Sequence, residues 1–176
     1  MSDLTETIDR LVRPIEDWPE PGVTFRDITP LLADPEALSA VMDGLVDLAT
    51  QAGPIDAVLG IEARGFLFGP SVAVRLGAGF VPVRKAGKLP STSLSTSYEL
   101  EYGAAVLEMH VDALMPGARV LVVDDVLATG GTMLAAADLV RQAGATVAGN
   151  LVLIELLALE GQARLAPVGC ASLRSY

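Results

Sequence analysis

From residue 57 to residue 157, short apolar runs alternate with amphipathic stretches, and this alternation limits the fold more than any other feature. Each apolar run has the length of a strand, and the amphipathic stretches repeat their apolar residues at helical spacing. Strands that alternate with helices form βαβ units with parallel pairing. The sequence therefore predicts an α/β fold with a central, mainly parallel sheet flanked by helices. We expect strands at Ala57–Ile61, Gly79–Val83, Val120–Val123 and Val147–Leu157, and helices at Gly65–Leu76 and Thr132–Ala143.

The remaining segments are expected to complete a single domain of residues 1–176, because no repeat or linker divides the chain. An amphipathic helix is expected up to about Arg13, then a turn-rich segment, and a second helix from Glu36 to Gln51. Lys85–Ser97 is rich in Ser, Thr, Gly and Lys and lacks periodicity, which predicts a loop. Tyr102–Met109 is predicted to be a strand, and a short helix and a final strand are expected after Leu157.

Composition and charge restrict the classes of function. The chain is 51% hydrophobic but only 5% aromatic, as in buried parallel sheets. The net charge of −10 argues against general binding to nucleic acid, which needs a positive field. No apolar run approaches a membrane span, and the first residues do not resemble a signal peptide. The lone Cys170 and the lone His110 exclude an internal disulfide and a Cys/His metal cluster, so we expect a reducing cytoplasm.

The segment from Asp124 to Thr132 is the most informative motif, because it joins an apolar strand to a helix through two acids and a turn of small residues. Gly130 and Gly131 allow the backbone to approach an anion closely. The N–H groups of the turn and of the first helical turn can then converge on a phosphate, and Thr129 and Thr132 add hydroxyl donors. The sequence therefore predicts a phosphate-binding loop.

The paired acids, predicted to end the strand, need a separate explanation. Carboxylates beside a phosphate would repel it unless they face sugar hydroxyls or Mg²⁺. A ribose that carries a phosphate at one end and a diol at the other provides that geometry. The plainer alternative is that Asp124 and Asp125 only end a strand and that Gly130 and Gly131 only make a turn. The order of strand, paired acids, small-residue turn and helix favours the binding site.

With these residues in that order, VVDDVLATGGT resembles the phosphoribosyl pyrophosphate signature of the type I phosphoribosyltransferases. The resemblance implies that fold, with a small N-terminal hood at about 14–35 and a flexible lid loop at about 85–101. It also implies Mg²⁺ as cofactor, held mainly through the substrate and near Asp124 and Asp125. These two acids would hold the ribose, and the loop would bind its 5-phosphate through Ala128, Thr129, Gly130, Gly131 and Thr132. Walker and dinucleotide-binding glycine patterns do not occur.

Further segments resemble the adenine branch of that family nearly end to end: PGVTFRDITPLL, GIEARGFLFGP, VPVRKAGKLP, SYELEYG and IELLALEG. This resemblance implies a purine-salvage enzyme that transfers the phosphoribosyl group to adenine and releases AMP and pyrophosphate. It further implies a homodimer in which Arg84 reaches into the neighbouring subunit's site.

The pyrophosphate is expected to bind between two of these segments. The resemblance assigns to it Glu62, Ala63 and Arg64, with a cis peptide between Glu62 and Ala63, and the cations Arg84, Lys85 and Lys88. The alternative is a surface salt bridge at Arg64 and a solvated loop around the other cations. Their position after the end of a strand favours the binding site.

A lid would exclude water while an oxocarbenium-like ribose forms. The family pattern places catalytic groups at Glu101 and Tyr102, and Arg64 is predicted to assist. Glu101 would handle a proton of the adenine ring, although a surface acid of the lid is the alternative.

Adenine is expected to contact Thr24, Phe25, Arg26 and Leu156. Phe25 can stack on the purine while main-chain groups of Thr24 and Arg26 read its edge, and Leu156 would press on the other face. Without the resemblance, Phe25 and Leu156 would be assigned to core packing. Asp27 is expected to support this pocket.

Two other functions compete with adenine transfer. One is phosphoribosyl transfer to xanthine, hypoxanthine or guanine. The other is a regulatory protein that keeps the fold and uses the ligand as a signal, although such proteins usually add a basic surface that this acidic chain lacks.

Overall fold

The computed structural model describes residues 2–99 and 104–176, which form two compact units, Met1–Gly44 and Leu45–Tyr176. The first unit contains the segment predicted as a hood. It holds helix α1 (Ser2–Leu11), strands β1 (Arg13–Ile15) and β2 (Phe25–Asp27), helix α2 (Thr29–Ala33) and the start of helix α3 (Pro35–Thr50). The turn-rich segment is therefore an antiparallel pair of short strands, with Ile15 opposite Phe25, followed by one short helix.

Two aspartates organise this first unit. Asp27 pairs with Arg13 across the strands at 2.5 Å and accepts the N–H of Thr29 at 2.9 Å, so it ties the hairpin to α2. The Arg13 guanidinium holds the pKa of Asp27 down at about 2. Asp34 accepts the N–H groups of Glu36 and Ala37 at 3.0 and 2.9 Å, which caps α3 just before Pro35.

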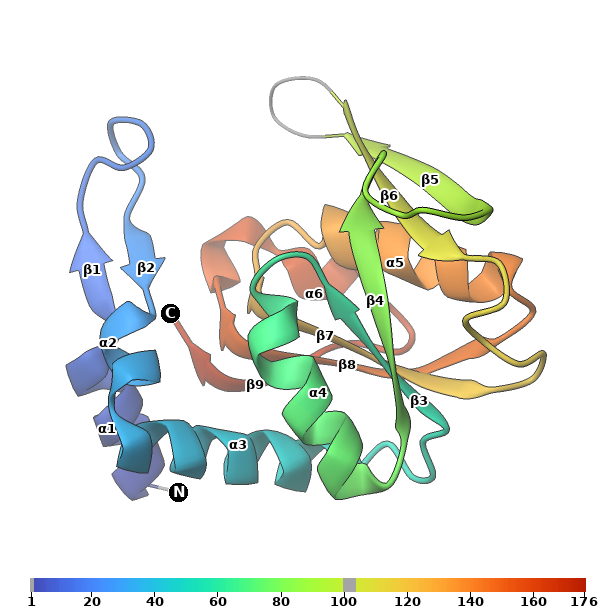
Figure 1. Cartoon of the computed structure of the whole chain (residues 1–176). Helices are drawn as coiled ribbons and strands as arrows, with labels where there is room; N and C mark the ends of the chain where they lie inside the picture. Colours follow the sequence, from blue (N-terminus) through green and yellow to red (C-terminus); the bar gives the residue numbers. More distant parts are fainter. Residues whose placement is uncertain (1, 100–103) are drawn as a thin grey trace. The chain divides into compact units, whose positions relative to one another are not determined.

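The second unit is built on a seven-stranded sheet with the order β5-β6-β4-β3-β7-β8-β9 (Figure 1). Pairing is parallel from β4 through β3, β7 and β8 to β9, and antiparallel where β6 joins β4 and β5. The predicted α/β fold with a mainly parallel sheet is confirmed. The strands are β3 (Ala57–Ile61), β4 (Gly79–Lys85), β5 (Ser93–Glu99), β6 (Ala104–His110), β7 (Arg119–Leu127), β8 (Thr146–Glu155) and β9 (Ala171–Ser175).

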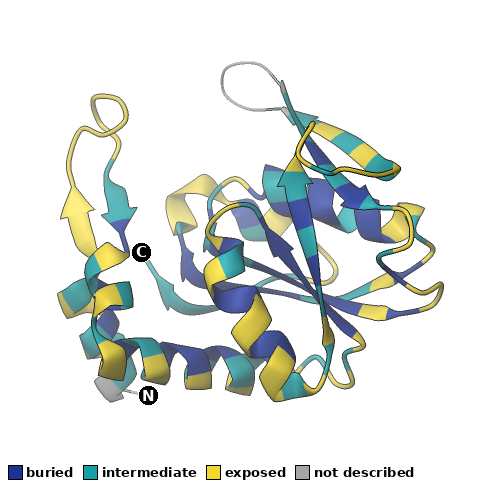
Figure 2. Cartoon of the chain, in the orientation of Figure 1, coloured by how far each residue is buried: buried dark blue, intermediate teal, exposed yellow. Residues whose placement is uncertain are grey.

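Helices α4 (Gly65–Leu76) and α5 (Gly131–Gln142) lie on opposite faces of this sheet (Figure 1). Leu59 and Ile61 of β3 share one core cluster with Leu139 of α5, whereas Gly60 faces the carbonyl of Gly65 at the start of α4. Because both faces are covered, β3 is buried along its whole length, as Figure 2 shows. Shorter elements, the 3₁₀ turn η1 (Leu157–Leu159) and helix α6 (Gly161–Arg164), follow β8.

The loop predicted at Lys85–Ser97 is wrong in its second half. Ser93–Glu99 forms edge strand β5, in full register with β6 from Ser93 opposite His110 to Glu99 opposite Ala104. Leu94 and Tyr98 pack against the core, whereas Ser95 and Ser97 are exposed. The period of two was therefore present, but small polar residues concealed it.

The predicted end of the strand at Val123 is also wrong. Strand β7 pairs with β3 only as far as Gly60 opposite Val123, but it continues beside β8 to Leu127 opposite Glu155. The two acids therefore lie inside β7, at the point where one of its neighbours ends. Of the helices in the described residues, none combines the length and the apolar character that crossing a bilayer requires.

Candidate active site

The predicted phosphate loop connects β7 to α5 and encloses a small hollow. Gly130 has φ of +81°, a conformation that glycine adopts without strain. Helix α5 begins at Gly131, and the N–H groups of its first turn have no acceptor within the helix. The hollow has a volume of about 60 Å³, lined by Asp124 and by residues 126–133, which is room for a small anion. The loop residues Ala128, Thr129, Gly130, Gly131 and Thr132 all line this hollow.

The two acids precede the loop in poorly solvated positions, and Asp124 lines the hollow. Asp125 is buried, with 3% of its surface exposed, and Asp124 is half-buried. Burial, followed by the charge of Asp125, raises the pKa of Asp124 to about 8. Burial also raises the pKa of Asp125, although Arg64 opposes this effect. Such a pair favours a ligand that brings hydroxyl donors or positive charge.

Arg64 joins the segment predicted to bind pyrophosphate to Asp125. Its Nε lies 2.9 Å from Oδ2 of Asp125. The peptide between Glu62 and Ala63 is cis, as expected. Gly65 makes the close approach feasible, because a Cβ at this position would lie 2.6 Å from the carbonyl oxygen of Val123. The start of α4 therefore rests directly on β7.

Glu62 gathers the predicted pyrophosphate-binding cations around one carboxylate. It pairs with Lys88 at 2.5 Å and with Arg84 at 3.4 Å, and it accepts the main-chain N–H of Lys85 at 3.0 Å. The Lys88 ammonium, with these other donors, lowers the pKa of Glu62 to about 2. Arg84 also donates to the carbonyl of Lys88 at 3.2 Å. The segments around residues 62 and 84–88 thus form one cluster.

The donor set fits a hard cation only when another molecule contributes ligands. In the described part of the chain, no group of three or more His, Cys, Asp or Glu residues could hold a metal. Asp124 and Asp125 offer carboxylate oxygens, which Mg²⁺ prefers, and their raised pKa values show that a positive charge there would be stabilising. These two carboxylates would therefore suit Mg²⁺ whose other ligands come from another molecule.

The residues predicted to bind adenine fall in both units. In the first, Phe25 packs edge-on against Trp18 with ring centroids 4.6 Å apart, Thr24 donates to Glu16 at 2.8 Å, and Arg26 is half-buried on β2. In the second, Leu156 follows β8 and donates its N–H to the carbonyl of Leu127 at 2.9 Å, so it lies beside the start of the phosphate loop. Glu101 and Tyr102 lie outside the described residues.

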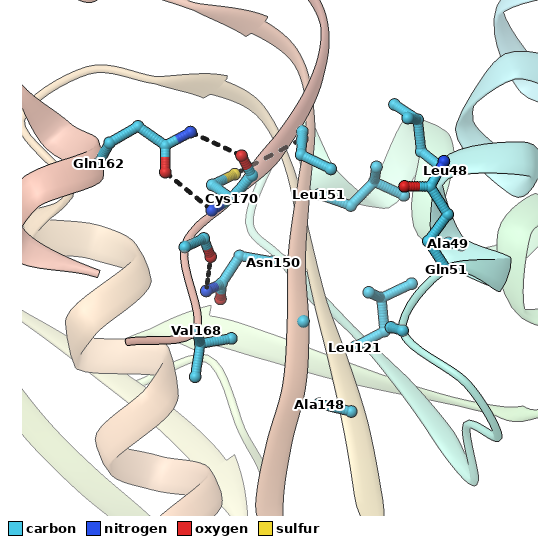
Figure 3. Close-up of a pocket in the computed structure, with 14 residues that line it drawn as sticks. Leu48, Ala49, Gln51, Leu121, Ala148, Asn150, Leu151, Gln162, Val168 and Cys170 are labelled. Atoms are coloured by element: carbon cyan, nitrogen blue, oxygen red, sulfur yellow. Dashed lines mark hydrogen bonds between the residues drawn. The ribbon is translucent and has the colours of Figure 1, made fainter. Parts of the chain in front are cut away.

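A short helix was expected after Leu157, but the packing of α6 against the phosphate loop was not predicted. Arg164 donates to the carbonyl of Thr129 at 3.3 Å. The signal was its position soon after IELLALEG, but a helix of four residues has no periodicity to detect. A separate cavity of about 410 Å³ lies between the end of α3 and strands β8 and β9 (Figure 3). None of the predicted site residues lines it.

With this geometry in place, comparison with known proteins gives the class. Residues 27–172 match the family described as "Phosphoribosyl transferase domain". The chain belongs to the phosphoribosyltransferase family.

Similar relatives narrow this class to one branch. An adenine phosphoribosyltransferase from Thermobifida fusca is 59% identical over 167 residues, which cover 95% of this chain and 94% of that protein. The solved adenine phosphoribosyltransferase from Thermoanaerobacter pseudethanolicus is 46% identical with a TM-score of 0.93, covering 98% of this chain and 99% of that one. The Saccharomyces cerevisiae enzyme, solved with an imino-altritol bisphosphate and adenine, is 34% identical with a TM-score of 0.90, covering 99% of each. The branch to which this chain is similar is therefore that of the adenine phosphoribosyltransferases.

Proposed function

We propose that this chain transfers the 5-phosphoribosyl group of phosphoribosyl pyrophosphate to adenine and so forms AMP and pyrophosphate. One observation carries the proposal. Asp124 lines an anion-sized hollow, and the next residue, Asp125, pairs with Arg64. Arg64 lies two residues after Glu62, which pairs with Lys88 and Arg84. This order of a phosphate site, diol-binding carboxylates and a second cationic site matches the order of groups along phosphoribosyl pyrophosphate. The relatives of this chain are named for the same reaction.

The reaction is a displacement at the anomeric carbon, with inversion and a dissociative transition state. The loop 128–132 holds the 5-phosphate, and Asp124 and Asp125 hold the ribose hydroxyls, so C1 faces the base. Arg64, Arg84, Lys85 and Lys88 stabilise the departing pyrophosphate as charge develops on it, with Glu62 and Ala63 in the same segment. Bound Mg²⁺ would neutralise phosphate charge and support the leaving group.

The roles of several further residues are part of the proposal. Glu101 handles the proton of the adenine ring, and Tyr102 lies near the reacting centre. Thr24, Phe25, Arg26 and Leu156 contact adenine, and Asp27 supports the hairpin that carries three of them. The segment at about 85–101, which includes β5, is proposed to act as a lid that excludes water.

A homodimer in a reducing cytoplasm is also proposed, on the family resemblance and on one surface feature. Helix α4 buries Phe68 and Val72 but leaves Leu67 46% and Val74 80% exposed. Exposed apolar side chains on one helix are consistent with a contact to a second copy. Sedimentation of the purified chain would test the assembly, and a monomer at micromolar concentration would contradict it.

A base competition assay tests the activity. Purified protein, Mg²⁺ and phosphoribosyl pyrophosphate are mixed with equal amounts of adenine, hypoxanthine, guanine and xanthine, and the nucleotides are separated. AMP is expected as the main product, and the double variant Asp124→Asn, Asp125→Asn is expected to form almost none. If another nucleotide is the main product, adenine is not the preferred base. If no base gives a nucleotide, the proposed phosphoribosyltransferase activity is refuted.

A further inference from the structure

The short helix α6 packs tightly against the phosphate loop. A Cβ added at Gly161 would overlap the carbonyl oxygen of Ala128, and a Cβ added at Gly130 would lie 3.0 Å from the carbonyl oxygen of Gly161. The two backbones therefore touch without intervening side chains. A change in the position of α6 must move the loop.

Two hydrogen bonds of Gln162 fix α6 to the segment that leads into β9. Its Nε2 donates to the carbonyl of Cys170 at 2.6 Å, and its Oε1 accepts the N–H of Cys170 at 2.9 Å, as Figure 3 shows. The Sγ of Cys170 lies 3.9 Å from the Sδ of Met133 in the first turn of α5. Cys170 thus contacts both α6, through Gln162, and α5, through Met133.

Arg164 is the charged side chain that α6 directs to this loop. Its Nη1 donates to the carbonyl of Thr129 at 3.3 Å, and its Cβ lies 3.6 Å from the position of a Cβ on Gly130. In a planar trans peptide, the C=O of one residue and the N–H of the next point in opposite directions. A donor that holds the Thr129 carbonyl on the side of α6 therefore turns the Gly130 N–H away from α6. Gly130 is one of the residues that line the hollow.

We propose that Arg164 is a positioning residue for the 5-phosphate, which orients the peptide between Thr129 and Gly130 and adds positive potential behind the loop. The proposal rests on the proposed function, because it assigns the hollow to the phosphate of phosphoribosyl pyrophosphate. A cation there matters in a chain of net charge −10, because the loop itself contributes only main-chain and hydroxyl donors. The acceptor base takes no part in this contact.

Two substitutions separate the hydrogen bond from the charge. Arg164→Gln keeps an amide donor without charge, and Arg164→Lys keeps the charge without the planar fork. Arg141→Gln is the matched control, because Arg141 is an exposed arginine at the other end of α5, paired with Asp138 at 3.2 Å. Steady-state kinetics with each substrate varied, and calorimetric binding of ribose 5-phosphate, are measured at low and moderate salt.

Arg164→Gln is expected to raise the KM for phosphoribosyl pyrophosphate and to weaken ribose 5-phosphate binding by about three- to tenfold, an effect that salt reduces. The KM for adenine is expected to stay unchanged. Arg164→Lys is expected to recover most of the loss, and Arg141→Gln to behave as the unsubstituted chain. Unchanged constants in Arg164→Gln, or equal losses for both substrates, would overturn the inference. The unsubstituted chain could form no AMP and yet bind ribose 5-phosphate more tightly than Arg164→Gln does. In that case the proposed function fails and the inference stands.

Discussion

Arg64 and Asp125 form an ion pair at 2.9 Å, although one follows β3 and the other lies inside β7. The side chain of Asp125 is 4% exposed and that of Arg64 is 44% exposed, so a buried carboxylate holds a guanidinium that reaches solvent. The pair connects the acids proposed to bind ribose to the segment proposed to bind pyrophosphate. A substrate that attracts Arg64 must therefore also satisfy Asp125, and ribose hydroxyls are suited to do so.

Asp125→Asn is expected to lower kcat/KM at least about a hundredfold, because it removes the partner of Arg64 and one charged acceptor for the ribose. The change keeps the side-chain volume, so the fold is expected to persist. Asp138→Asn, in the second half of α5, serves as control and is expected to keep normal turnover. Equal kcat/KM in the two variants would remove Asp125 from the site.

Asp124→Asn is expected to stabilise the ligand-free chain. The pKa of Asp124 is about 8 in the fold and 3.8 in the unfolded chain, so protonation favours the fold. The contribution of protonated Asp124 to the free energy of unfolding is complete below about pH 4 and is lost as the pH rises through 8. The substitution should therefore raise the free energy of unfolding by about 1–3 kcal/mol at pH 8.5 and by less at pH 6.

Urea unfolding of the unsubstituted and Asp124→Asn chains at both pH values measures this difference. Asp138→Asn is expected to have the opposite sign at pH 8.5, because hydrogen bonds from Gln142 and other neighbours lower the pKa of Asp138. If the Asp124→Asn chain is less stable than the unsubstituted chain at pH 8.5, the charged form of Asp124 is not destabilised by its surroundings.

The strands and helices with a clear pattern of apolar residues could be predicted from the sequence. The bounds of β3 and α4 were predicted to the residue, because an apolar run and a helical repeat each end at a clear break. The edge strand β5 was missed, because pairing with β6 rather than its own hydrophobicity makes it a strand. The end of β7 was misplaced for a related reason: β8 continues beside Asp124 after β3 has ended, and no local pattern reports the length of a neighbour.

Glu62→Gln is expected to strengthen inhibition by pyrophosphate about three- to tenfold, because the carboxylate that holds Lys88 and Arg84 would lose its charge. The amide would still accept the N–H of Lys85. Product inhibition constants measure the effect. Glu108→Gln is the control, since Glu108 accepts the N–H of nearby Gly87 at 3.0 Å. Weaker inhibition in Glu62→Gln would show instead that Glu62 itself helps to bind pyrophosphate.

Gly65→Ala is expected to lower the free energy of unfolding by about 1–3 kcal/mol and to reduce kcat/KM more than that loss alone explains. The added methyl would push the start of α4 away from Val123 and move Arg64 with it. Gly79→Ala is the matched control, because its Cβ would lie 3.8 Å from the nearest atom. Similar losses in both variants, in thermal unfolding and turnover, would contradict the role of this contact.

The site was less predictable from sequence than the fold. Residue types and order indicated the acids, the glycines and the cations, and the structure brings those of the second unit together. The pairing of Glu62 with Lys88 and of Arg64 with Asp125 could not be read from the chain, because each depends on strands that are distant in sequence. Arg164 was missed because its contact is to a main-chain carbonyl, for which any donor of suitable length would serve.

The last pairing between β3 and β7 joins Gly60 to Val123, one residue before the first of the two acids. In a strand, a slip by a single residue turns every side chain to the opposite face. A substitution at Leu59 or Val122 that altered this register would therefore abolish activity, although every residue proposed to contact the ligands would still be present. In this chain, selection for activity must therefore also act on buried apolar residues that do not contact the substrate.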